Sequence, residues 1–150
     1  MKRSDLYFAI VMLAIFLPFF ISPELYAWYK DFNAFHPLIM AFLKFGILAT
    51  LGEMLGCRIS TGKYTTPTFG VMPRMVVWGI LGMAISMAMT VFAAGIPAFI
   101  SSMGGANLVA DFAAEGLSWG KFVVALSISV MMNTFFAPVF MTFHKITDAH

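Results

Sequence analysis

The chain alternates between long apolar segments and short polar ones, and this pattern predicts four membrane-spanning helices. The apolar segments cover residues 6–21, 37–55, 75–99 and 122–143. A bilayer core of about 30 Å requires about 20 apolar residues in a helix, so the first segment is slightly short and the others are long enough. The stretch 75–100 contains no charged residue, and its length excludes the short strands of a soluble core.

The polar segment between the first two spans carries a helical pattern of its own. Ser22, Pro23 and Glu24 are typical of a helix start, as N-cap, first helical residue and first-turn acid. Apolar residues then recur at helical spacing, namely Leu25, Trp28, Tyr29, Phe32 and Phe35. We therefore expect a short amphipathic helix in the outer membrane interface, which acts either as an aromatic belt that fixes its depth or as a lid over a pathway.

The two other loops differ in character. The second outer loop, residues 101–120, predicts a turn at Gly104 and Gly105 and a brief helix around Leu108 and Phe112. The inner loop, residues 58–74, is rich in Thr, Gly and Pro and predicts irregular backbone. Its cations are expected to enforce the topology and contact anionic lipid, with phosphate binding as the weaker alternative; they are Arg58, Lys63 and Arg74.

Composition excludes most soluble classes. Hydrophobic residues make up 61% of the chain and charged residues 11%, against about 25% charged in soluble domains. The mean hydropathy is +0.89, and a net charge of +2 gives no basic face for nucleic acid. The predicted fold is all-α, a single domain over residues 1–150 that forms a membrane bundle of four transmembrane helices plus the interfacial helix.

The distribution of Lys and Arg predicts the orientation in the membrane. One side carries six of these residues and the other carries two, Lys30 and Lys121. Both termini are therefore expected on the cytoplasmic side, with the first span retained as a signal anchor. Because no Arg- and Ser-rich transit segment is visible, a prokaryotic plasma membrane is the simpler expected location. The six residues are Lys2, Arg3, Arg58, Lys63, Arg74 and Lys145.

Small residues recur along the later spans and predict helix–helix packing seams, since small side chains let backbones approach closely in lipid. The seam of the second span includes the Gly52-x-x-x-Gly56 pattern, and the fourth span carries Ala125, Ser129 and Asn133. The predicted packing residues of the second and third spans are Gly46, Gly52, Gly56, Gly79, Gly82 and Ser86.

Three polar residues inside the spans are the candidate functional residues, because charge in a membrane is costly. Glu53 shares a face with Gly46 and is predicted either to pair with Arg58 or Arg74 or to line a pathway. Lys44 lies roughly 10 Å below the outer boundary, where it either reaches the headgroups or biases ion choice. Asn133 is expected to bond between helices or to contribute a polar wall group.

No pattern in the sequence indicates an enzyme or a metal site. The chain has no Gly-x-Ser-x-Gly, no His-Glu-x-x-His and no paired carboxylates on one helical face. Cys57 is its only cysteine, and the three histidines have no metal-ligand spacing. We therefore expect no catalytic residue, metal or cofactor.

At the second span the sequence resembles the Mpv-seventeen and peroxisomal-membrane-protein-22 family. The residues that carry the resemblance are Tyr29, His36-Pro37, Gly46, Gly52-Glu53, Arg74, Gly82, Asn133, Pro138 and His144-Lys145. The chain departs from the family pattern at Glu53, where aspartate is usual, and at Lys44, where threonine is common. The resemblance implies a small four-helix protein that forms or regulates a weakly selective pore.

The leading hypothesis is a small channel or transport-related protein of the lipid bilayer, with Glu53 and Asn133 on the pathway wall. Helices closed by small-residue seams leave little room for water, so a pore would need a homo-oligomer or a conformational opening. The alternative is a non-transporting scaffold or partner subunit. A hydrated cavity around Glu53 and Asn133 favours transport, whereas Glu53 closed against an arginine in a dry seam favours the scaffold; the transported solute or ion is not specified by the sequence.

Overall fold

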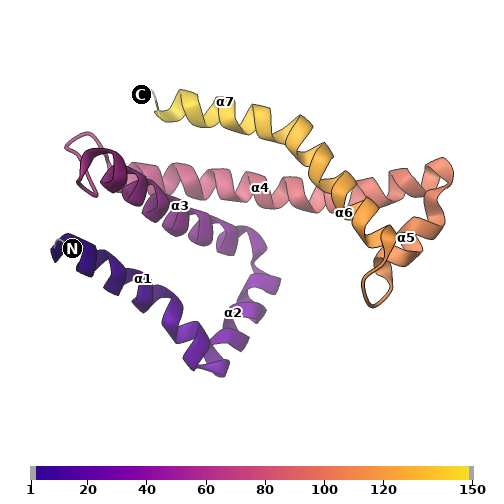
Figure 1. Cartoon of the computed structure of the whole chain (residues 1–150), viewed down its shortest axis with the longest axis horizontal. Helices are drawn as coiled ribbons and strands as arrows, with labels where there is room; N and C mark the ends of the chain where they lie inside the picture. The colour runs from indigo at the N-terminus through magenta and orange to yellow at the C-terminus, as the bar shows by residue number, and fades with distance from the viewer. Residues whose placement is uncertain (1–2, 149–150) are drawn as a thin grey trace. The chain divides into compact units, whose positions relative to one another are not determined.

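The computed structural model describes residues 3–148, and within that range every regular element is a helix. The elements, in chain order, are α1 (Arg3–Ile21), α2 (Pro23–Phe35), α3 (Pro37–Thr61), α4 (Val71–Ile100), η1 (Ser101–Gly105), α5 (Ala106–Ala113), α6 (Trp119–Met131), η2 (Met132–Phe136) and α7 (Ala137–Asp148) (Figure 1). The label η marks a π-helical turn. The predicted all-helical character is confirmed.

Within the described residues, four helical stretches are long and apolar enough to cross a membrane. They are Arg3–Ile21, Pro37–Thr61, Val71–Ala113 and Trp119–Thr147. Each contains one of the predicted apolar segments, so the number and order of the long apolar helices are confirmed. Each is also longer than its predicted segment, except at Ile21 and Pro37, because helical hydrogen bonding continues into the flanking polar residues.

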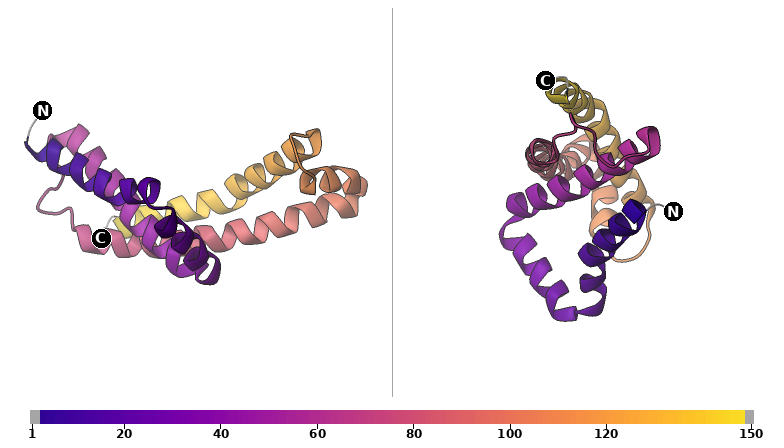
Figure 2. Two further views of the ribbon diagram at one scale, coloured as in Figure 1. Left: turned by 90° about the horizontal axis from the view of Figure 1, so that it is seen from below. Right: turned by 90° about the vertical axis from the view of Figure 1, so that its left-hand side faces the viewer.

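The chain divides into two compact units, one up to Gly82 and one from Met83 onward. The first unit holds α1, α2, α3 and the first part of α4. Single residues make the sharp changes of direction between its first three helices (Figure 2). Ser22 has an extended backbone and its hydroxyl accepts a hydrogen bond from the Leu25 N–H at 3.2 Å, which confirms the predicted N-cap. His36 makes the second turn, directly before Pro37.

The irregular part of the inner loop is shorter than the predicted range 58–74. Helix α3 continues to Thr61, and α4 already begins at Val71. The Ser60 and Thr61 hydroxyls donate to carbonyl oxygens one turn back, a bond that lets these residues sit in a helix. Gly62 then ends α3 with a φ of 76°, a left-handed conformation that glycine adopts without strain.

The second unit is organised around the contact between α5 and α6. The Ser118 hydroxyl caps α6 by accepting from the Lys121 N–H at 3.1 Å and also donates to the Asp111 carbonyl oxygen of α5. Val124 on α6 is completely buried. Gly104, with a φ of 93°, marks the kink before α5. The predicted turn and the brief helix that follows it are therefore confirmed.

Helix α6 leads through the π-helical turn η2 into α7 as one helical path (Figure 1). Pro138 follows the turn by two residues. A proline removes one backbone donor and strains the preceding turn, and π-type turns are one way in which a helix absorbs this.

Candidate functional site

Glycines bring α3 and the beginning of α4 into close contact. A Cβ atom on Gly46 would lie 2.8 Å from a carbonyl oxygen of α4. A Cβ atom on Gly79 would overlap the Phe42 ring, and one on Gly82 would overlap Phe45. A side chain larger than hydrogen would therefore clash at all three positions, so α3 and the beginning of α4 approach closely there.

Glu53 lies at the end of this seam that is nearer to the loop between α3 and α4, and it is held by two side chains of α4. It follows Gly46 by seven residues, about two helical turns, so it faces α4 as Gly46 does. One carboxylate oxygen accepts a charge-assisted hydrogen bond from Nη1 of Arg74, and the other accepts from Nε1 of Trp78 at 2.9 Å. Arg74 and Trp78 are four residues apart, which places them on one face of α4.

Arg74 is fixed from the loop side as well. Its Nε donates to the Phe69 carbonyl oxygen at 2.7 Å, and its guanidinium carbon lies 4.6 Å from the centre of the Phe69 ring. Phe69 is itself buried. Phe69, at the end of the loop, thus contacts the Arg74 guanidinium on the side away from its bond to Glu53.

The Glu53–Arg74 pair is partly enclosed, with 21% of the Glu53 side chain and 27% of the Arg74 side chain exposed. The two charges have opposite sign, and the second carboxylate oxygen accepts a hydrogen bond from the Trp78 N–H. The arrangement is a salt bridge that connects α3 with α4. It presents neither a nucleophile with a base nor a row of open carboxylate oxygens.

Thr50 lies one turn before Glu53 on α3 and is 3% exposed. Its Oγ1 is buried and makes no hydrogen bond to any part of the chain that the structure describes. Buried hydroxyls in proteins are normally bonded. Thr50 therefore places a buried hydroxyl without a described hydrogen-bond partner one turn from the Glu53–Arg74 pair.

A second polar cluster connects the start of α1 with the end of α3. Asp5 accepts from the Arg58 guanidinium through both carboxylate oxygens, at 2.7 and 3.0 Å, and from the Tyr64 hydroxyl at 3.2 Å. The Tyr64 ring stacks on Phe8 of α1, with ring centres 4.6 Å apart. We refer to Asp5, Arg58 and Tyr64 as the inner clasp.

The inner clasp raises the pKa of the Tyr64 hydroxyl above its ordinary value of 10.0. Burial of the ring is the largest cause, and the nearby negative charge of Asp5 is the next. Both oppose a second negative charge at this position. Tyr64 therefore stays protonated and keeps donating to Asp5 at a higher pH than a free tyrosine would.

Lys44 lies at the other end of α3, away from both clusters. Its Nζ donates to the Asn33 side-chain oxygen of α2 at 2.9 Å and lies 5.8 Å from the centre of the Tyr29 ring. Both neighbours are neutral, and no carboxylate within the described residues forms an ion pair with it. Lys44 and Glu53 are thus held in separate surroundings, as their spacing along one helix predicts.

Asn133 belongs to the second unit and lies in the π-helical turn η2. Its side chain is exposed, and its Nδ2 donates to the Ser129 carbonyl oxygen of its own helix at 2.8 Å. The bond between helices expected for Asn133 is therefore not the bond described. Its place on a pathway wall stays a prediction.

The remaining candidates are spread over separate surfaces. Gly52 and Gly56 have no described atom within 4 Å of where a Cβ would stand. Six residues rotate a helix by about 240°, so Gly52 faces away from the seam of Gly46, and the packing role of the pair stays a prediction. The same holds for Ser86, a half-buried residue of the second unit. Lys63 is exposed and, within residues 3–148, forms no ion pair with a carboxylate.

Sequence reasoning missed the partners that complete these clusters. Trp78 was recognisable only as one apolar residue among many, although its position four residues after Arg74 places it on the same face. The contact of Phe69 with Arg74 depends on loop geometry that has no sequence signal. Asp5 lies in the N-terminal segment, on the same predicted side as the inner basic residues, and this was a usable signal.

Comparisons with known proteins add no relative. No protein-family model matches the chain, and no significant match is found among curated proteins or solved structures. The resemblance to the Mpv-seventeen and peroxisomal-membrane-protein-22 family therefore stays a prediction. Within the described residues, His, Cys, Asp and Glu do not gather in any group of three or more that could hold a metal ion.

Proposed function

We propose that the chain is an integral membrane protein that acts as a non-transporting scaffold or partner subunit. The first part of the proposal rests on helices that are apolar and largely uncovered. No residue of α1 is buried, and only 22% of the most apolar window of α3 is buried. Such surfaces are stable only in an apolar surrounding such as lipid, here taken as a prokaryotic plasma membrane with both termini on the cytoplasmic side.

The second part rests on one observation, the closure of Glu53 by Arg74 and Trp78. A carboxylate that lines a water-filled path must offer its oxygens to passing solutes, whereas both oxygens of Glu53 are bonded to α4. The seam beside it is too tight for a Cβ atom at Gly46 or Gly79. This geometry supports a role for Glu53 in holding α3 and α4 together, in preference to a role in lining a conducting path.

A weakly selective channel is the second candidate function, and Thr50 favours it. Its buried Oγ1 has no partner within the described chain, and a water molecule or solute at that position would satisfy it. For a path to run past Thr50, the Glu53–Arg74 pair would have to separate. The two candidates therefore make opposite predictions about conduction.

Single-channel recording from the purified chain in planar bilayers separates the candidates. We expect no discrete openings from the wild-type protein, because the paired charges and the tight seam leave no polar path. Glu53→Gln, which removes the charge, should also be silent. Lys63→Gln is the matched control, since it removes an exposed loop charge outside the seam.

Discrete openings from folded, inserted wild-type protein would contradict the scaffold proposal. If their conductance or ion preference changes in Glu53→Gln and not in Lys63→Gln, the chain is a pore with Glu53 on its wall. Circular dichroism and a monodisperse elution profile establish that each silent sample is folded.

A further inference from the structure

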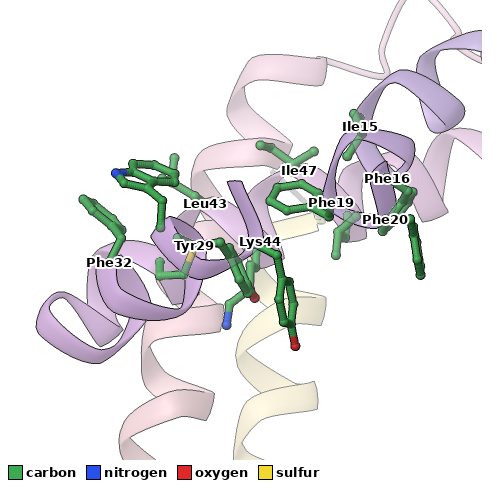
Figure 3. Close-up of a pocket in the computed structure, with 13 residues that line it drawn as sticks. Ile15, Phe16, Phe19, Phe20, Tyr29, Phe32, Leu43, Lys44 and Ile47 are labelled. Atoms are coloured by element: carbon green, nitrogen blue, oxygen red, sulfur yellow. The ribbon is translucent and has the colours of Figure 1, made fainter. Parts of the chain in front are cut away.

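An apolar cavity of about 430 Å³ lies between α1, α2 and α3 in the first unit (Figure 3). Its volume falls within the roughly 300–1,000 Å³ of small-molecule sites. Aromatic rings from α1 and α2 form much of its lining, with apolar side chains of α3 completing it. Representative lining residues are Phe16, Phe19, Tyr29, Phe32, Lys44 and Ile47.

Among the described residues that line this cavity, Lys44 is the only charged one. Its ammonium group is bonded to the neutral Asn33 amide and faces the Tyr29 ring. The other ionic side chains of this unit that the structure pairs, Asp5 with Arg58 and Glu53 with Arg74, have partners of opposite charge. The cavity thus combines an apolar body with one uncompensated positive charge, which is complementary to an anionic amphiphile.

The position of Lys44 along α3 matches the depth of such a molecule in a bilayer. Lys44 follows Pro37, the first residue of α3, by seven residues, which corresponds to roughly 10 Å along the helix axis. A lysine side chain at this depth extends toward the headgroup region while its methylene groups stay in apolar surroundings. The apolar lining contributed by Ile47 and Phe16 lies where an acyl chain would run.

We propose that this cavity binds one acyl chain of an anionic membrane phospholipid, whose headgroup phosphate pairs with Lys44. The inference rests on the proposed insertion in a membrane and is independent of whether the chain conducts. The Asn33 amide holds the ammonium group in place, and the Tyr29 ring shields one side of it. The cavity walls supply affinity for the chain, and Lys44 supplies the preference for negative charge.

Native mass spectrometry of the full chain, loaded with phosphatidylglycerol or phosphatidylcholine of the same acyl composition, tests this proposal. One lysine near a membrane surface contributes a roughly fivefold preference for an anionic lipid, so we expect phosphatidylglycerol to be retained about fivefold more. Lys44→Gln should abolish this preference, and Lys44→Arg should keep it. Lys30→Gln is the matched control, because Lys30 also lies over a tyrosine ring, at 5.5 Å from the centre of Tyr26, and does not line the cavity.

A second measurement addresses the acyl chain and does not depend on Lys44. Phosphatidylglycerol brominated along its acyl chain should quench the fluorescence of Trp28, which lines the cavity, and Trp28→Phe should remove that quenched component. Ile47→Phe fills the cavity and should reduce quenching while leaving the charge intact.

Three outcomes would overturn the proposal. Equal retention of both lipids by the wild-type chain, or an unchanged preference in Lys44→Gln, removes the role of Lys44. Retention of oleate without any preference between the phospholipids assigns the cavity to a free fatty acid instead. None of these outcomes bears on the planar-bilayer recordings, so failure of this inference is distinguishable from failure of the scaffold proposal.

Discussion

At the residue scale, the surroundings of Tyr64 determine the pKa of its hydroxyl. Its hydroxyl donates to Asp5 while its ring stacks on Phe8 and lies beside Arg58. The protonated form is the one that this environment holds, and the raised pKa follows from it. The stability of the inner clasp therefore depends on pH in the alkaline range through the protonation of Tyr64.

Between pH 10.0 and the raised pKa of Tyr64, the folded protein binds more protons than the unfolded one. We therefore expect the free energy of unfolding to fall as the pH rises through this window and the fall to end once Tyr64 ionises in the folded state. Denaturant unfolding in detergent at a series of alkaline pH values measures it. Tyr64→Phe should lack this part of the fall.

Tyr7→Phe is the matched control, since it also removes one tyrosine hydroxyl from the first unit. Tyr7 is on α1, like Asp5, but is 67% exposed. Its removal should leave the alkaline fall as it is in the wild-type chain. An equally steep fall in Tyr64→Phe would show that the clasp does not hold the protonated phenol.

At the scale of the element, the glycines of one helix pair divide into two groups with different consequences. Gly79 and Gly82 face the rings of α3, whereas Gly52 and Gly56 stand open within the described chain. Glycine thus lies at a close helix contact at these two positions of α4 and on an uncovered surface at these two positions of α3. Substitutions that add one methyl group distinguish the two situations.

We expect Gly79→Ala and Gly82→Ala each to lower the free energy of unfolding by about 1–3 kcal/mol, because the added methyl group forces a packed ring to move. Gly95→Ala is the matched control on the same helix, since no described atom of another element lies within 4 Å of its Cβ position. It should be neutral or stabilising by up to about 1 kcal/mol through helix propensity. Thermal unfolding of the three variants in one detergent compares them. Equal stability of Gly79→Ala and Gly95→Ala would contradict the close contact.

The elements were largely predictable from the sequence because hydrophobic periodicity and capping are local signals. The Ser22-Pro23-Glu24 start of α2 and the break at Gly104 needed no tertiary information. The end of α3 was placed too early, because Ser60 and Thr61 read as loop residues until their bonds to carbonyls of the preceding turn are seen.

The candidate site was less predictable, because it depends on which residues of separate helices meet. The pairing of Glu53 with an arginine was one of two open alternatives, and only the seam geometry selects Arg74. The neutral partner of Lys44, Asn33, lies on another helix eleven residues earlier. Periodicity gives the face of a helix and not the identity of its neighbour.

For the whole molecule, the distribution of Lys and Arg predicts which loops face the cytoplasm. Arg58 and Lys63 lie together at the end of α3 and in the loop that follows, as the predicted inner side requires. Single cysteines in a Cys57→Ser background test this with a membrane-impermeant maleimide. We expect Glu115→Cys to react in intact cells and Lys63→Cys to react only after the membrane is opened.

Both labelled positions are exposed, so a difference between them reports the side of the membrane and not burial. Labelling of Lys63→Cys in intact cells would reverse the proposed orientation. Equal labelling of both positions in intact cells would contradict the crossing of the membrane between them.

The inner clasp also has a consequence for the order of assembly during synthesis. Asp5 is separated by 53 residues from Arg58 and by 59 from Tyr64, so a ribosome delivers the carboxylate long before either of these partners. Helix α1 is complete long before the clasp can form, and the clasp closes only after α2 and α3 have been made. The helix that is made first is therefore among the last to be joined at its N-terminal end, and a chain that stalls before residue 58 lacks that contact altogether.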